Sequence, residues 1–136
     1  MLSDRLIGSV KKHEGYRSKA YQDSLGVWTI GYGTNLQTLE IPKELAEDWL
    51  VQYLRHEQAL LETLSVYREL NEVRQEVLIE MAYQLGHSGL RKFKKMWAAL
   101  VIEDYKWAAT EMLDSTWHKQ TPKRAEELAE RMRTGL

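Results

Sequence analysis

The sequence of 136 residues contains no cysteine, only two prolines, and no apolar run long enough to span a membrane. Without cysteine the fold uses neither a disulfide nor a thiolate metal site, so it can form in a reducing compartment. Lys and Arg number 19 against 20 acidic residues, a balance that argues against a dedicated nucleic-acid binder. Asp4 and Arg5 interrupt the apolar residues at the N-terminus, which therefore predicts neither a signal peptide nor a membrane anchor.

Hydrophobic residues make up 43% of the chain, enough for the core of a single domain, with room for two lobes. Apolar residues recur at helical spacing along most of its length. This pattern predicts helices over 2–13, 43–64, 71–86, 91–101, 104–114 and 121–135, with a loop at "GHSGL". Pro42, Asn71, Thr121 and Pro122 are start signals, and Gly15, Gly86 and Gly135 are stop signals.

Residues 20–34 have a different pattern. The segment "SLG" at 24–26 is a turn signal, and "VWTIGY" after it is rich in β-branched and aromatic residues. This predicts two short strands that form a hairpin. In the second strand Val27, Thr29 and Gly31 share one face because side chains alternate along a strand. The sequence therefore predicts a mainly α protein (α+β) with one small β element near the N-terminus.

Three polar residues around this hairpin could carry out glycoside hydrolysis. That reaction needs one protonated carboxyl group, one ionised carboxylate and a positioned water molecule. Glu14 at a helix end, shielded by apolar neighbours, is expected to keep its proton, while the more solvated Asp23 stays ionised. Thr29 offers a hydroxyl group. On spacing alone, the favoured interpretation is an ordinary surface glutamate, a turn-forming aspartate and a strand threonine.

The residues that flank these three carry a resemblance to a known family. The segment "HEGYRSKAYQDSLGVWTIGYGTN" resembles the catalytic segment of the phage-type lysozymes of the T-even coliphages, glycoside hydrolase family 24. Farther along, "MAYQLGHSGLRKF" resembles the family's Gln-x-Gly helix end and the loop after it. "TWHKQTPKRAEELAERMRTG" resembles its C-terminal helix. The three motifs occur in the family's order and cover nearly the whole chain.

The resemblance implies a role for each residue of the catalytic set. Glu14 would be the general acid, Asp23 would orient or activate the attacking water, and Thr29 would help to hold that water. Arg124 matches an arginine that pairs with the catalytic glutamate. If Thr121 caps the last helix, Arg124 lies in its first turn, where the helix dipole disfavours a cation, so a carboxylate partner is expected.

Two further residues, Gln84 and Trp117, match substrate-side positions of the family, and Tyr32 is a third candidate for substrate binding. Gln84 could offer its amide to sugar hydroxyl or acetamido groups, and Trp117 and Tyr32 could contact the substrate. For Gln84 and Trp117 a purely structural role is an equal alternative. The histidines do not have metal-ligand spacing, and the resemblance implies neither a metal nor a cofactor.

The resemblance also implies a two-lobed lysozyme-like fold with the glycan bound in a cleft between the lobes. The expected divisions of the single domain 1–136 are a small β-containing lobe (14–45), a helical lobe (1–13 and 65–136) and a linking helix (46–64). Thr34 and Asn35 stand where the T-even enzyme has a structural histidine. The segment from Asn35 to Pro42 is short, so the sheet of the small lobe is expected to be reduced.

The expected function follows from the resemblance. The protein would be an endo-acting, inverting muramidase that cleaves the β-1,4 bond from N-acetylmuramic acid to N-acetylglucosamine in peptidoglycan. As a monomeric phage endolysin, it would be made in the host cytoplasm and released to the wall through a separate holin pore, without inserting into the membrane. A lytic transglycosylase and a catalytically inactive wall-binding module are the alternatives.

Overall fold

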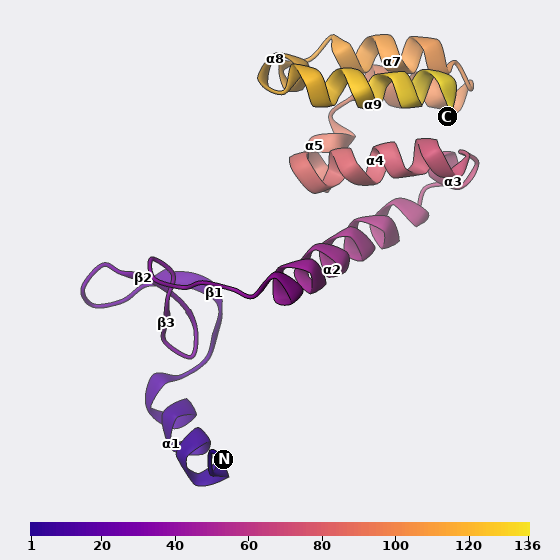
Figure 1. Ribbon diagram of the computed structural model, residues 1–136. Helices are drawn as coiled ribbons and strands as arrows, with labels where there is room; N and C mark the ends of the chain where they lie inside the picture. Colours follow the sequence, from indigo (N-terminus) through magenta and orange to yellow (C-terminus); the bar gives the residue numbers. More distant parts are fainter. The chain divides into compact units, whose positions relative to one another are not determined.

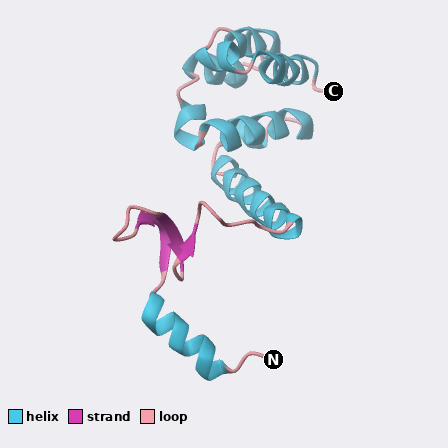
Figure 2. Cartoon of the chain, turned by 60° about the vertical axis from the view of Figure 1, so that its left-hand side comes forward, coloured by secondary structure: helices cyan, strands magenta, loops and turns pink.

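The computed structural model describes residues 1–136, and these form nine helices and a three-stranded sheet (Figures 1 and 2). The chain divides into two compact units, Met1–Ala46 and Glu47–Leu136. The prediction of a mainly α protein with a small β element is confirmed. The predicted assignment of residues 1–13 to the helical lobe stays a prediction. None of the helices combines the length and the apolar character that a membrane span requires.

The first unit begins with helix α1 (Asp4–Glu14). Ser3 caps its start, because the Ser3 side chain accepts a hydrogen bond from the Leu6 N–H at 3.1 Å. Gly15 ends the helix with a φ of 72°, a conformation that glycine adopts without steric cost. Glu14 is therefore fixed as the last helical residue, immediately before the chain turns into the sheet.

An antiparallel sheet follows, with strands β1 (Arg17–Gln22), β2 (Trp28–Gly31) and β3 (Thr34–Asn35) in that order. The predicted hairpin is thus present, with Gln22 opposite Trp28. The register between β1 and β2 is interrupted by a bulge between Arg17 and Tyr21. On its other edge, β2 pairs with β3, which has only two residues. This short strand agrees with the short segment that follows Asn35.

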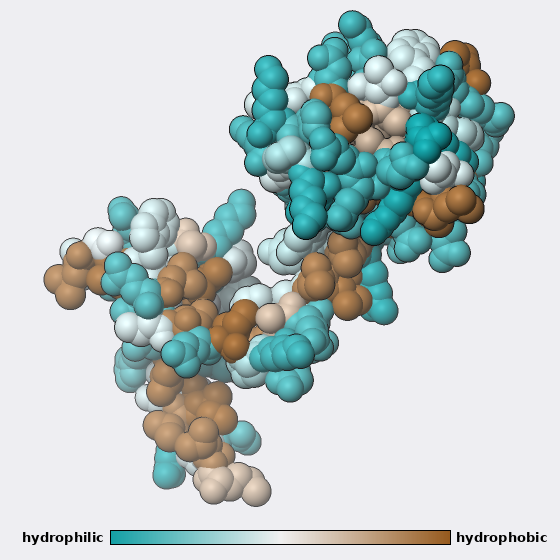
Figure 3. Space-filling model, turned by 45° about the horizontal axis from the view of Figure 1, so that its top comes forward, coloured by the Kyte–Doolittle hydropathy of each residue, from teal (hydrophilic) through white to brown (hydrophobic).

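The first unit buries almost none of its side chains. Thr29 is its only buried residue, and α1 has none. Leu6, Ile7 and Val10, whose spacing predicts α1, are each at least 40% exposed. The apolar atoms on α1 are visible at the lower end of Figure 3. The geometry of this unit consequently rests on helix capping, strand pairing and turns rather than on an apolar core.

The second unit contains the hydrophobic core. Every buried apolar side chain lies between Leu61 and Met132, at the end of α2 (Lys43–Glu62), in the helices that follow it, or at Leu70 between two of these helices. These are α3 (Ser65–Arg68), α4 (Glu72–Leu85), α5 (His87–Arg91), α6 (Lys94–Val101), α7 (Tyr105–Leu113), α8 (Thr116–Gln120) and α9 (Pro122–Thr134). Helices α7 and α9 lie side by side (Figure 1). This core supports the helix ends that carry Gln84, Trp117 and Arg124.

Several helix boundaries follow from their predicted signals. The side chain of Asn71 accepts a hydrogen bond from the Arg74 N–H at the start of α4, and Gly86 ends that helix. Pro122 opens α9, and Gly135 closes it in the left-handed conformation. Thr121 stands at the predicted N-cap, but its hydroxyl donates to the Trp117 carbonyl instead of capping α9.

The structure corrects the sequence analysis at four short elements. The segment predicted as a loop at 86–90 contains helix α5, and helices α3 and α8 and strand β3 were not predicted. Each is five residues or shorter, so none completes the apolar repeat by which a helix or strand is detected in a sequence. These elements form where longer helices and β2 supply the packing or pairing partner.

The location of the core makes a testable distinction between two valines of the second unit. Val77 in α4 is 1% exposed, and Val101 in α6 is 64% exposed. We predict that Val77→Ala lowers the free energy of unfolding by about 2 kcal/mol, because two buried methyl groups are lost and a cavity remains. Val101→Ala is the matched control and should change the free energy of unfolding by less than about 0.5 kcal/mol. Urea unfolding measures both, and equal effects would contradict the assigned core.

Candidate active site

The turn between β1 and β2 is built around the side chain of Asp23. Its Oδ1 atom accepts hydrogen bonds from the backbone N–H groups of Leu25 at 2.8 Å and Val27 at 2.9 Å. The backbone of Asp23 also pairs with Val27, since the Asp23 N–H donates to the Val27 carbonyl at 2.9 Å. Asp23 is half-buried, and its Oδ2 atom takes part in none of these bonds. One oxygen of the carboxylate thus holds the turn, and the other remains available.

Thr29 lies on β2 and is tied to the same turn. It is 4% exposed, and its hydroxyl donates a hydrogen bond to the Val27 carbonyl at 2.9 Å. Strand pairing places it opposite Tyr21 on β1 and Asn35 on β3. Because the hydroxyl proton is already directed at Val27, the oxygen of Thr29 can only accept a further hydrogen bond. Asp23 and Thr29 are therefore linked through the main chain of one residue, Val27.

Glu14 reaches the sheet from the end of α1, at the turn between β2 and β3. Its carboxylate lies against Gly33, where a Cβ atom would overlap Oε2 of Glu14. Gly33 has a φ of 75° in the turn between β2 and β3. Glu14 thus lies at the turn between β2 and β3, Asp23 lies in the turn at the other end of β2, and Thr29 lies on the strand between them. Glu14 is exposed, so the residues of the first unit do not provide the expected apolar shielding.

Tyr32, the other predicted site residue of this unit, belongs to an exposed aromatic pair. Its ring centroid lies 5.4 Å from that of Tyr16, and Nζ of Lys11 is 5.5 Å from the Tyr32 ring. Both tyrosines are at least 43% exposed. Sugar rings and aromatic faces pack well against each other, so the pair could contact a glycan next to Glu14.

Arg124 lies in the first turn of α9, and its partner in the second unit is Glu80. The Nε–H of Arg124 donates to Oε2 of Glu80 at 2.8 Å, and both side chains are a little over one third exposed. The expectation that a carboxylate offsets this cation at a helix N-terminus is met by Glu80. No pattern in the sequence indicated Glu80 as the partner, because it lies 44 positions from Arg124. The pairing of Arg124 with Glu14 stays a prediction.

Gln84 and Trp117 are joined directly. The indole Nε1–H of Trp117 donates to Oε1 of Gln84 at 2.9 Å, and Trp117 is 3% exposed. Its ring packs edge-on against Phe93 with centroids 6.1 Å apart. An indole N–H can only donate, so it fixes which end of the Gln84 amide is the oxygen. The NH₂ group of Gln84 is consequently directed away from Trp117.

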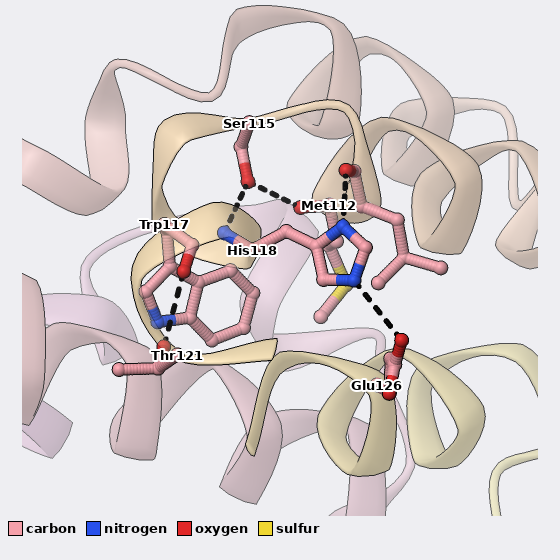
Figure 4. Close-up of polar contacts among 7 residues, drawn as sticks. Met112, Ser115, Trp117, His118, Thr121 and Glu126 are labelled. Carbon is pink, nitrogen blue, oxygen red and sulfur yellow. Dashed lines mark hydrogen bonds and ion pairs between the residues drawn. The ribbon is translucent and has the colours of Figure 1, made fainter. Parts of the chain in front are cut away.

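The position of Trp117 depends on a group of polar contacts at the α7–α9 junction (Figure 4). Oγ of Ser115 accepts from the His118 N–H at 3.1 Å and so caps α8. The hydroxyl of Thr121 donates to the Trp117 carbonyl at 3.1 Å. The His118 ring connects this junction to α9 through Glu126, with Nε2 and Oε1 3.2 Å apart. These contacts hold Trp117 next to Gln84 and set the start of the helix that carries Arg124.

The arrangement can support acid–base chemistry with a positioned water molecule. Oδ2 of Asp23 and the oxygen of Thr29 are both acceptors, and a water molecule has two hydrogens to donate to them. Such a water presents its lone pairs outward as a nucleophile. Glu14 supplies a second carboxyl group in the same unit. No group of three or more His, Asp or Glu side chains capable of holding a metal ion is present.

Comparisons with known proteins give a consistent set of similarities. The family model described as phage lysozyme matches residues 11–134. The chain is 31% identical to the probable T4-type lysozyme 2 of Dictyostelium discoideum over 159 residues, which cover 93% of this chain and 92% of that protein. It is 29% identical to the endolysin of Acyrthosiphon pisum secondary endosymbiont phage 1, over 87% of this chain and 80% of that one.

A third similarity is to the peptidoglycan hydrolase gp36 of Pseudomonas phage phiKMV, at 27% identity over 88% of this chain and 14% of that protein. The alignment with the Dictyostelium protein is longer than the chain itself, so that protein carries residues which this chain lacks.

The contact between Glu14 and Gly33 can be tested with two glycine substitutions. Gly33 and Gly26 both have positive φ, but a Cβ atom at Gly26 would meet nothing within 4 Å. Each change to alanine should cost about 1–2 kcal/mol of unfolding free energy through backbone strain. Only Gly33→Ala should also displace the Glu14 carboxylate, because that flexible end is what the new methyl group meets. The carboxyl resonance of Glu14 in carbon-labelled protein would then shift in Gly33→Ala alone, and an unchanged resonance would contradict the contact.

Proposed function

Because the chain belongs to the phage lysozyme family, we propose that it is a muramidase. Its substrate is peptidoglycan, and it cleaves the β-1,4 bond from N-acetylmuramic acid to N-acetylglucosamine within the glycan strand. The similarity to a peptidoglycan hydrolase and to an endolysin supports this substrate. The observation that carries the proposal is the first unit itself, in which Asp23 and Thr29 share Val27 as a hydrogen-bond partner and Glu14 lies against Gly33.

The proposed reaction assigns one step to each of these side chains. Glu14 donates its proton to the glycosidic oxygen as the bond breaks, which makes the leaving sugar a neutral alcohol. The attacking water donates its two hydrogens to Oδ2 of Asp23 and to the oxygen of Thr29. Asp23 takes the proton as the water adds to the anomeric carbon. Attack from the side opposite the leaving group inverts that carbon.

The residues of the second unit are proposed to bind rather than to react. Gln84 offers its NH₂ group to a carbonyl or hydroxyl oxygen of the substrate. Trp117 is buried and acts through Gln84, so it is a positioning residue. Arg124, which Glu80 holds in place, is a supporting residue of this unit. In the first unit, Tyr32 offers an exposed aromatic face to the substrate.

In its biological role the protein is an endolysin. It is made in the cytoplasm of the infected bacterium, acts as a monomer and reaches the wall through a pore formed by a separate holin. The named endolysin among the similar proteins supports this role. Expression in a strain that lacks any holin tests the route: the protein should stay inside intact cells, and its appearance in the periplasm would contradict it.

A charge-neutral substitution tests the proposed acid. Glu14→Gln keeps the size of the side chain but removes the transferable proton, so hydrolysis should fall by about 10²–10⁴-fold. Unfolding free energy should change by less than about 0.5 kcal/mol, because Glu14 is exposed. Clearing of a suspension of permeabilised bacteria measures the activity.

The matched control is Glu40→Gln, which removes the same charge from an exposed residue of the same unit. It should clear the suspension at the rate of the unsubstituted protein. Full activity of Glu14→Gln would remove Glu14 from the mechanism.

A further inference from the structure

One face of the small sheet carries a row of three side chains, and the proposed reaction uses only the middle one. Tyr21 on β1, Thr29 on β2 and Asn35 on β3 lie directly opposite one another in the strand register. Residues that are directly opposite in antiparallel strands point to the same side of a sheet. Asn35 therefore shares a face with the hydroxyl group that is proposed to hold the attacking water.

The pairing of Asn35 with Thr29 is of the closer of two kinds. The Leu36 N–H donates to the Trp28 carbonyl at 2.9 Å, so the hydrogen bond of the ladder lies beside the Thr29–Asn35 pair and not within it. In such a pair the Cα atoms are about 4.5 Å apart, and the side chains approach each other more closely than in a hydrogen-bonded pair. Asn35 is half-buried. Its side chain consequently begins next to that of Thr29.

The direction of the Asn35 amide is set by the turn that follows it. Its Oδ1 atom accepts a hydrogen bond from the Gln37 N–H at 2.8 Å. A backbone N–H can only donate, so the atom that faces it must be the amide oxygen. The NH₂ group is the other end of the amide and carries two donor hydrogens. The turn thus accounts for the oxygen of Asn35 and leaves the nitrogen to donate to a ligand.

The two ends of the row differ in charge. The guanidinium of Arg17 lies 4.2 Å from the ring centroid of Tyr21, so the β1 end offers a cation. A guanidinium is suited to a carboxylate or a phosphate. The NH₂ group of Asn35 is neutral, and a neutral carbonyl matches it without burying an unbalanced charge. The β3 end therefore favours a neutral carbonyl oxygen.

The proposed substrate has such an oxygen close to the reacting atom. The water adds to the anomeric carbon of N-acetylmuramic acid, and the next carbon of the same ring carries an acetamido group. The carbonyl of that group has two lone pairs to accept hydrogen bonds. A donor beside the residue that holds the water is thus within reach of this carbonyl when the anomeric carbon faces the water.

We propose that Asn35 is a substrate-binding residue that recognises the acetamido group of the N-acetylmuramic acid unit at which the water adds. Its NH₂ group donates to the acetamido carbonyl, while its Oδ1 atom continues to accept from Gln37. The contact orients the anomeric carbon toward the water held by Asp23 and Thr29. This inference rests on the proposed function, because it takes peptidoglycan as the substrate. It implies that glycan strands without N-acetyl groups are cleaved more slowly.

The test compares hydrolysis of two glycan strands, one N-acetylated and one de-N-acetylated. The ratio of kcat/KM for the two strands is measured with the unsubstituted protein, with Asn35→Asp and with Gln22→Glu. Asn35→Asp keeps an oxygen to accept from Gln37 and replaces the NH₂ group by a second acceptor. Gln22→Glu is the matched control, since it makes the same amide-to-carboxylate change at an exposed residue opposite Trp28, on the other face of the sheet.

The unsubstituted protein and Gln22→Glu should cleave the N-acetylated strand about 3- to 10-fold faster, the size of a neutral hydrogen bond. Asn35→Asp should lose this preference or reverse it, because a carboxylate cannot donate to a carbonyl but attracts the ammonium of the de-N-acetylated sugar. Hydrolysis by Asn35→Asp with the preference unchanged would overturn the inference and leave the muramidase standing.

A second measurement needs no variant to fold. In nitrogen-labelled unsubstituted protein, titration with an N-acetylated disaccharide of the glycan should shift the side-chain NH₂ resonances of Asn35, and the de-N-acetylated disaccharide should not. Binding of the N-acetylated sugar without that shift would overturn the inference. The shift in a protein that hydrolyses neither strand would do the reverse, keeping Asn35 as a sugar contact and removing the muramidase.

Discussion

The hydrogen bonds from the backbone of Leu25 and Val27 to Asp23 are the constraint on which the candidate site depends. They fix the turn that joins β1 to β2 and orient one oxygen of the carboxylate. The Val27 carbonyl, set by the same turn, takes the hydroxyl proton of Thr29. A single local arrangement thus determines which lone pairs of Asp23 and Thr29 remain to hold a water molecule. In the proposed mechanism, the geometry of this turn positions the nucleophilic water.

The two units use different physical means to hold their residues. In the second unit the buried side chains between Leu61 and Met132 support the helix ends that carry Gln84, Trp117 and Arg124. The first unit buries only Thr29, so capping, strand pairing and the turn must maintain it. Small units without an apolar core are marginally stable, and their local structure opens more readily than a packed core. The candidate residues Glu14, Asp23 and Thr29 therefore lie in the unit that has no apolar core of its own.

Sequence patterns predicted the parts of the fold that local signals determine. Pro42, Asn71, Gly86 and Pro122 marked the boundaries of α2, α4 and α9, and the segment 24–26 marked the hairpin. Short elements such as α5 and α8 were not predicted, because they depend on neighbouring helices rather than on their own apolar repeat.

The site was predictable to a similar extent. The positions of Glu14, Asp23 and Thr29 came from a motif, but spacing alone could not show that Val27 connects the last two. Contacts between residues far apart in the chain could not be predicted from sequence patterns. Neither the Glu80–Arg124 pair nor the unpaired oxygen of Glu57 could be foreseen, because each depends on how separate helices pack.

The central claim is that a water molecule, held by Asp23 and Thr29, adds to the anomeric carbon as Glu14 protonates the leaving sugar. Mass spectrometry of the fragments released from purified peptidoglycan in isotopically labelled water tests it most directly. We predict that every new N-acetylmuramic acid end is a reducing end that carries one labelled oxygen. Ends closed as an unlabelled anhydro ring would contradict it, because they form without water.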